Sequence, residues 1–526
     1  MTRYSYGTGT ETASIILNDF SGGMVNTPQV MDYAQLSKTQ SPYCYNVDTS
    51  GKSIRKIKGF SKVTTGAITG DISTIWYDTL TSTTYVGYGT QLGTITGTSI
   101  TQITGGSGFT SNKTWAFCRV GSYILCINGT DQPKLWNGTA LSNITTPPAT
   151  WAANNYPLYA TNWMGRAFAF ITNSDTLFYS KLRDLTDWSP GTAATSGGAF
   201  VVGSDGAPIR ATVPLANGLL VIKDAGLYYF SGTGDTSGNF DQTTFDYRML
   251  STEVDCLSPR AVVEVGDALI VWGRNDVFWL EGTQDQQRVS VTRIGAAISY
   301  DINNVTALQA QVTAAHYPQR NQVWFAVAKD NGSTTIDTVY CYDYVHKQWF
   351  KRNGYAHKCM ANVKDPNGVT QIYSGGYSPN GYIYQQNSTY DFDGAAILWQ
   401  YYTSWIPLVG IAKGRSPLAI ISLGPDTTQP ISYTYAYDYN NSDYTSTTLS
   451  PNTSSSTWHT SGGTGTSTWG TGGGTTGTYS TGSATVTQTK LYGRGRTIQH
   501  RFSGNVVGSN FAILEIMHPV TNQGYR

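Results

Sequence analysis

The side chains that could do chemistry are scattered along this chain, and none falls into the spacing of a known catalytic or metal site. No HExxH or HxH phrase and no GxSxG or phosphate-binding loop occurs. The six cysteines form no CxxC pair and no cluster with histidine. The histidines are isolated from one another: His316, His346, His357, His459, His500 and His518. We therefore expect no metal and no cofactor.

Carboxylates are also too sparse to suggest acid–base catalysis. A glycosidase would need two carboxyl groups that flank the scissile bond. Glutamate is rare, and its copies at Glu253, Glu264, Glu281 and Glu515 are widely separated. The sequence therefore predicts that this protein is not an enzyme.

The elements that would hold any site are short β-hairpins, which repeat along the chain. Val262 to Gly282 contains two apolar runs around a Gly/Asn/Asp turn, a pattern typical of a hairpin. The runs are nearly continuous, which indicates strands covered on both faces. The same phrase surrounds Gly121, Gly165 and Gly218. Looser copies begin at Ser73, Tyr317 and Asn367.

A repeat of roughly 40–50 residues with strand–turn–strand content is typical of a propeller blade. The pattern predicts an all-β fold: a β-propeller of six to seven blades over residues 66–398. A long β-sandwich or a solenoid is the alternative architecture. Composition agrees with an all-β chain, because Gly (57), Tyr (36) and Trp (14) are abundant while charged residues make up only 13%.

The flanking regions differ from the repeats. Residues 1–65 read as an N-terminal segment whose strands join a second domain or close the propeller. Residues 399–526 read as a β-sandwich or platform domain. Within it, residues 441–483 are almost entirely Ser, Thr and Gly, which predicts a long inserted loop.

The overall charge argues against a dedicated nucleic-acid binder. The chain has 34 basic and 33 acidic residues, a net charge of +1, whereas such binders carry a basic excess. A surface with nearly equal numbers of basic and acidic residues would suit a protein along which nucleic acid moves without binding tightly. The N-terminus shows no apolar signal core, and no run reaches membrane-spanning length, so we expect a protein that is not secreted through a signal peptide. Scattered cysteines favour buried thiols and a reducing compartment.

Two groups of residues are candidates for contacts with partners. Lys52, Arg55, Lys56 and Lys58 form a local basic cluster. It predicts either a contact patch for nucleic acid or an acidic partner, or a solvated strand edge. The second group is Trp458, Trp469 and Tyr479, aromatic residues within the Ser/Thr/Gly-rich loop. They predict either a docking or gate element, or local packing onto the sandwich.

The N-terminal sequence resembles that of a known protein family. LNDFSGGMVNTP and, further on, YNVDTSGKSIRKIKGF are similar to the opening of bacteriophage tail proteins of the tail-tubular B, or nozzle, type. Lys58 stands directly before Gly59, where the family phrase reads R-x-G-F, so this part of the match is approximate. LFYSKLRDLTDW, from Leu177 to Trp188, is similar to a blade edge of that family. The matching residues of the opening are Phe20, Gly22, Gly23, Asn26, Asn46, Gly59 and Phe60.

The resemblance implies a structural virion protein of a short-tailed phage, made in the host cytoplasm and located in the tail. Six copies would form a ring beneath the adaptor, the head-to-tail connector. Tail fibres or spikes would be further partners. Genomic DNA would pass through the ring without sequence-specific binding, and no small-molecule substrate is implied. The alternative is a glycan-binding or glycan-cleaving propeller used in host recognition, and a third possibility is a scaffold that resembles WD-repeat propellers.

Overall fold

The chain forms two compact units in the computed structural model. The propeller unit comprises Phe60–Val345 and Asn353–Ser388, and the two-sheet unit comprises Met1–Gly59, His346–Arg352 and Thr389–Arg526. No helix in the described parts of these units is long and apolar enough to cross a membrane. The structure describes residues 12–27, 36–66, 68–224, 226–233, 241–282, 289–305, 307–365, 367–378, 381–408, 413–440, 444–451 and 485–522.

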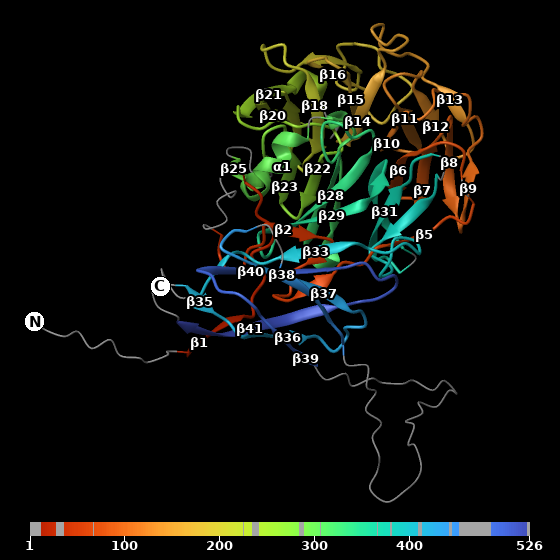
Figure 1. Cartoon of the computed structure of the whole chain (residues 1–526). Helices are drawn as coiled ribbons and strands as arrows, with labels where there is room; N and C mark the ends of the chain where they lie inside the picture. The colour runs from red at the N-terminus through yellow and green to blue at the C-terminus, as the bar shows by residue number, and fades with distance from the viewer. Residues whose placement is uncertain are drawn as a thin grey trace, which may run out of the picture. The chain divides into compact units, whose positions relative to one another are not determined.

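The propeller unit is built from antiparallel four-stranded sheets that follow one another in chain order (Figure 1). The first blade contains β6 (Ile72–Asp78), β7 (Thr83–Tyr88), β8 (Gln91–Thr96) and β9 (Ser99–Gln102). The second contains β10 (Ala116–Val120), β11 (Tyr123–Ile127), β12 (Lys134–Trp136) and β13 (Leu141–Asn143). The third contains β14 (Pro157–Trp163), β15 (Arg166–Ile171), β16 (Thr176–Tyr179) and β17 (Gly198–Val201).

The later blades follow the same plan. The fourth contains β18 (Ile209–Pro214), β19 (Leu219–Lys223), β20 (Gly226–Ser231) and β21 (Asp246–Ser251). The fifth contains β22 (Val262–Val265), β23 (Ala268–Trp272), β24 (Val277–Glu281) and β25 (Ser290–Arg293). After the short helix α1 (Ser299–Asn304) come β26 (Thr313–Tyr317), β27 (Gln322–Val327), β28 (Ile336–Asp343) and β29 (Gln348–His357). The last blade contains β30 (Cys359–Lys364), β31 (Thr370–Gly375), β32 (Ile383–Gln386) and β5 (Phe60–Lys62).

The predicted β-propeller is therefore present, and the blade count agrees with the predicted six to seven. Six four-stranded sheets stand by themselves, and β26 to β29 supply a further set of four strands. The chain passes from one unit to the other within β29. The hairpin predicted at Val262 to Gly282 is β22 to β24, and β23 is buried along its whole length. That burial explains the continuous apolar run.

Apolar clusters join neighbouring blades. One cluster links the first and second blades, and Trp76 stacks on Phe117 there with ring centroids 5.5 Å apart. Two others link the second blade to the third and the third to the fourth. A fourth cluster closes the circle, because Ile72 and Ile75 of the first blade pack with Cys359 and Val363 of the last. The outer strand of that last blade is β5, which arrives from the N-terminal side and pairs with β32.

The two-sheet unit combines both ends of the described chain. One sheet has the order β3-β4-β41-β36-β39, with β1 and β35 paired to β41, and the other includes β2-β33-β40-β37-β38, with β34 paired to β40. The strands of the first sheet are β1 (Thr12–Leu17), β3 (Val47–Asp48), β4 (Ile54–Lys56), β35 (Gly414–Arg415), β36 (Leu418–Leu423), β39 (Thr485–Lys490) and β41 (Ala512–Asn522). Those of the second are β2 (Tyr43–Tyr45), β33 (Trp399–Tyr402), β34 (Ile406–Pro407), β37 (Ile431–Tyr437), β38 (Tyr444–Leu449) and β40 (Thr497–Gly504).

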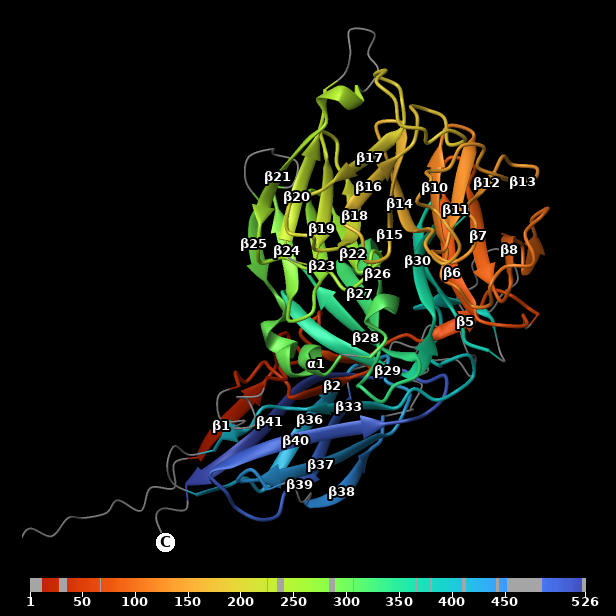
Figure 2. The ribbon, with the colours of Figure 1, turned by 90° about the horizontal axis from the view of Figure 1, so that it is seen from above.

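Ring contacts show that these two sheets face each other (Figure 2). Trp399 of β33 stacks on Phe511, which immediately precedes β41, with ring centroids 3.8 Å apart. His500 of β40 and His518 of β41 lie 5.2 Å apart by the same measure. Phe20 joins them from the first part of the chain, since its ring centroid lies 5.9 Å from that of Tyr401 in β33.

The unit boundaries differ from the predicted ranges at both ends of the propeller and at His346–Arg352, which lies within the predicted propeller range but belongs to the two-sheet unit. The propeller unit begins at Phe60 rather than at residue 66 and ends at Ser388 rather than at residue 398. The N-terminal segment is split, since β1 to β4 belong to the two-sheet unit while β5 belongs to the propeller. The predicted loop 441–483 also contains a strand, β38, which pairs with β37 and buries Leu449. Pairing with β37 outweighs the low apolar content of the segment.

Candidate functional site

The predicted basic cluster does not form a continuous patch, because Lys56 points into the two-sheet unit. Its side chain is buried, and Nζ donates hydrogen bonds to the carbonyl oxygens of Val506 (3.0 Å) and Ser509 (2.9 Å). Burial lowers the pKa of Lys56 to about 8, while the charge of Asp391 opposes this shift. Lys56 therefore serves the fold, and the expectation that it lies on a contact surface is wrong.

The other three members lie nearer the surface. Lys52 and Arg55 are exposed, and Arg55 Nε donates to Ser53 Oγ at 2.9 Å. Lys58 is half-buried, with its ammonium group 5.6 Å from the centroid of the Tyr390 ring. The aromatic residues predicted for docking, Trp458, Trp469 and Tyr479, lie outside the described residues.

We expect the substitution Lys56→Met to destabilise the two-sheet unit by about 1–3 kcal/mol, since it leaves two inward carbonyl groups without a charged donor. Lys52→Ala is the matched control and should change the free energy of unfolding by less than about 0.5 kcal/mol, because that side chain is exposed. Urea titration of the full chain measures both effects. Equal stability of the two variants would contradict the structural role of Lys56.

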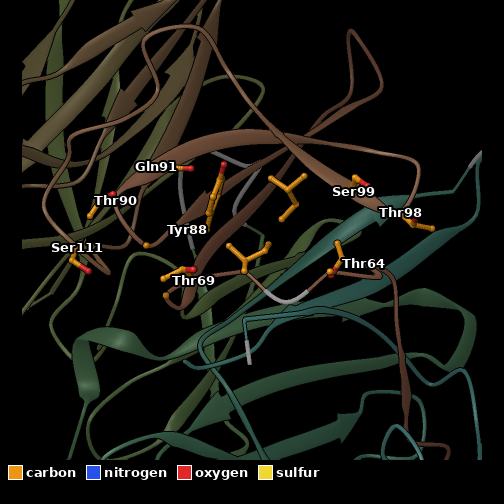
Figure 3. Close-up of a pocket in the computed structure, with 13 residues that line it drawn as sticks. Thr64, Thr69, Tyr88, Thr90, Gln91, Thr98, Ser99 and Ser111 are labelled. Atoms are coloured by element: carbon orange, nitrogen blue, oxygen red, sulfur yellow. The ribbon is translucent and has the colours of Figure 1, made fainter. Parts of the chain in front are cut away.

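The propeller unit has a groove of about 570 Å³ where the chain enters the first blade. Its walls come from the segment between β5 and β6, the β7–β8 turn, the β8–β9 turn and the loop before β10 (Figure 3). We call it the hydroxyl groove. Its lining residues are Thr64, Gly66, Ile68, Thr69, Gly70, Tyr88, Gly89, Thr90, Gln91, Thr98, Ser99, Ile100 and Ser111.

Two glycines allow the walls of the hydroxyl groove to meet at its base. Gly70 has φ of +99°, and a Cβ there would lie 2.6 Å from the Cα atom of Gly89. Gly89 has φ of +48°, and its own Cβ would lie 2.7 Å from the carbonyl oxygen of Thr69. Backbone hydrogen bonds fasten the outer wall, where the amide of Thr65 donates to the carbonyl of Thr98 at 3.0 Å. The groove is thus held by main-chain contacts, which leaves its side chains available.

The polar side chains of the groove are mostly unpaired. Thr64 is an exception, since its hydroxyl accepts from the amide of Ile383 at 3.2 Å. Several others make no side-chain hydrogen bond with the described protein: Thr69, Tyr88, Thr90, Gln91, Ser99 and Ser111. Tyr88 is 8% exposed, and burial raises the pKa of its phenol. It therefore remains a neutral hydroxyl near pH 7.

Two smaller cavities in the propeller unit have different linings. One, of about 220 Å³, is aromatic and includes Phe60, Tyr355, Tyr377 and Tyr384. The other, of about 190 Å³, includes the carboxylates of Asp224, Glu253, Asp255 and Asp276 together with Arg293. Burial raises the pKa of Asp255, and Asp224 is paired with Arg210 and Arg274. No group of three or more potential metal ligands occurs among the described residues.

Sequence reasoning did not identify the hydroxyl groove. Its polar residues are ordinary Ser, Thr and Gln in turns, and they come from four separate stretches between residues 64 and 111. The six cysteines are all buried and form no disulfide, as expected from their scattered positions. The nearest signal for the groove was the cluster of Thr and Gly around residues 64–70 and 89–111.

Comparisons with known proteins give distant structural similarity only. No family model matches the chain, and no curated protein matches it. Solved propeller structures similar to it include YCF48 bound to a D1 peptide, at 12% identity and TM-score 0.38, covering 62% of this chain and 94% of that one. The computationally designed protein Ika8 matches at 11% identity and TM-score 0.37, covering 62% and 99%. The N-terminal domain of Nup159 matches at 10% identity and TM-score 0.36, covering 62% and 95%.

Proposed function

We propose that this chain is a structural subunit of a phage virion, whose copies form a hexameric tail nozzle that extends the genome-ejection channel below the adaptor. The observation that supports the proposal most is the N-terminal phrase that resembles nozzle proteins. Its glycines and Asn46 occupy positions in the two-sheet unit that few other residues could fill. A repeated heterologous interface that closes a ring is a common form of assembly.

The Gly22-Gly23 pair lies where the backbone is crowded. A Cβ on Gly22 would lie 2.6 Å from Thr39 Oγ1, and one on Gly23 would lie 2.7 Å from the carbonyl oxygen of Trp349. The amide of Met24 donates to that same carbonyl at 2.7 Å. These contacts attach the N-terminal segment to the start of β29, and only glycine fits them.

Asn46 and Gly59 have similarly demanding positions. Asn46 adopts a positive φ of 55°, and its side-chain amide donates to the carbonyl of Leu398 at 2.7 Å. A Cβ on Gly59 would lie 1.8 Å from the carbonyl oxygen of Asp391. The residues of this phrase are therefore needed where the N-terminal segment packs against later segments of the two-sheet unit. A protein with the same phrase would be expected to share this construction.

The net charge of the chain is consistent with a channel wall along which DNA moves without binding tightly. The net charge of +1 provides no excess of cations to hold phosphates, so transit would not be slowed by tight binding. No residue in this proposal has a catalytic role. The adaptor ring and tail fibres or spikes are the proposed partners.

Electron microscopy of the purified full chain tests this proposal. We expect six-fold rings or short tubes with an axial channel, either alone or after mixing with adaptor rings. Sedimentation velocity should show a species of six copies under the same conditions. Protein that remains monomeric in the presence of adaptor rings would contradict the proposal. Tight binding of duplex DNA at moderate salt would contradict the proposal that DNA passes the channel wall without binding tightly.

A further inference from the structure

We propose that the hydroxyl groove is a binding site for a neutral oligosaccharide. The site lies entirely within the propeller unit and does not depend on the tail assembly. Three properties carry the inference: an uncharged lining, several unpaired hydroxyl and amide groups, and an apolar floor.

The lining contains no Asp, Glu, Lys, Arg or His among the residues that the structure describes there. A phosphate or carboxylate ligand would require cationic groups or an array of backbone N–H donors, and a cationic ligand would require carboxylates or an open aromatic cage. The described lining offers no cationic and no acidic side chain, and its one aromatic residue, Tyr88, is buried. Its ligand should therefore be uncharged.

The hydrogen-bonding groups match the chemistry of a sugar. A sugar hydroxyl both donates and accepts, as do the hydroxyls of Thr69, Thr90 and Ser111 and the amide of Gln91. These groups come from separate walls of the groove (Figure 3). A purely apolar ligand would leave them unsatisfied and would bind poorly.

The apolar part of the groove is small, and it suits the faces of pyranose rings. Ile68 and Ile100 are half-buried against the cluster that joins the first and last blades, and Tyr88 belongs to that cluster. The exposed edges of the two isoleucines supply contact area between the polar groups. The groove volume of about 570 Å³ lies within the ~300–1,000 Å³ of typical ligand sites, so a short oligosaccharide fits better than a single sugar.

The test is calorimetric titration of the full chain with isomaltotriose, lactose and N,N′-diacetylchitobiose, with glucuronic acid as the charged probe. We expect at least one neutral sugar to bind with Kd on the order of 1 mM or tighter. Gln91→Ala and Ser111→Ala should each weaken that binding roughly fivefold to tenfold, which corresponds to one lost hydrogen bond. Gln132→Ala, an exposed glutamine on the second blade, is the matched control and should leave the affinity unchanged.

A measurement on the unaltered protein complements the variants. Hydrogen exchange with and without the bound sugar should show new protection in residues 64–70 and 88–91, and none in the second blade. Failure of all three neutral sugars to bind overturns the proposal. So does tighter binding of glucuronic acid, or neutral-sugar binding that the groove variants leave unchanged. Loss of ring assembly in Gln91→Ala with no sugar effect would instead assign the groove to contact between copies.

Discussion

Replacement of Gly59 with alanine is expected to lower the stability of the two-sheet unit by about 3 kcal/mol or more. The added Cβ would lie 1.8 Å from the carbonyl oxygen of Asp391 and 2.6 Å from its carbonyl carbon. Both obstacles are backbone atoms, so a side-chain rotation cannot relieve the clash. The amide of Gly59 also donates to the carbonyl of Thr389 at 2.6 Å, which holds the two segments together.

The measurement is a urea titration of the full chain, followed by near-ultraviolet circular dichroism of the aromatic residues. Gly51→Ala is the matched control, because Gly51 is exposed and its nearest contact would be Ser53 Oγ at 3.9 Å. That variant should be neutral or slightly stabilising. A Gly59→Ala protein with the unfolding midpoint of the control would show that the Asp391 segment moves freely.

Acidification from pH 6.5 to pH 4 is expected to destabilise the two-sheet unit, because two histidines are buried in its core. Both rings are fully buried, and His500 Nδ1 lies 2.8 Å from the hydroxyl of Tyr433. Neither ring nitrogen of His518 has a hydrogen-bond partner among the residues that the structure describes. Burial lowers the pKa of His518 to about 4, and the charge of Lys38 adds to this. Burial also lowers the pKa of His500, and His518 contributes.

The direction of the pH effect follows from these lowered pKa values. Above pH 6.5 both histidines are neutral in the folded and unfolded chains, so stability does not depend on them. Below pH 6.5 the histidines of the unfolded chain bind protons, whereas the buried histidines of the folded chain do not. The free energy of unfolding therefore falls as the pH is lowered. For His518 the loss approaches ~3 kcal/mol near pH 4. In the propeller unit, burial opposes the shift at Asp78, but hydrogen bonds and Arg119 outweigh it, so the pKa of Asp78 is lowered. That unit therefore loses stability below about pH 4, in a separate window.

Urea midpoints measured across this pH range test the expectation. His518→Leu should flatten the dependence between pH 6.5 and pH 4, since it removes one buried base. His346→Leu is the control, because His346 is exposed, and it should retain the full dependence. An unchanged pH profile in His518→Leu would show that His518 is hydrated or protonated in the folded chain.

The sequence by itself determined the repeating hairpins, because their signal is local. Gly266 turns the chain between two strands, and the apolar run from Leu269 to Trp272 is continuous because β23 is buried on both faces. The same reasoning located the other hairpins and the all-β class. It also excluded recognisable metal and nucleophile motifs, which depend on short spacings.

The tertiary structure alone decided how distant segments meet. The pairing of β5 with β32 joins residues more than 300 positions apart, and no local pattern specifies that partner. Lys56 appeared as one of four nearby cations, yet carbonyl groups from the far end of the chain hold it inside the core. His500 and His518 become neighbours only because β40 and β41 lie in facing sheets. Likewise, the hydroxyl groove exists because four turns converge, and convergence is a property of the closed fold rather than of any single stretch.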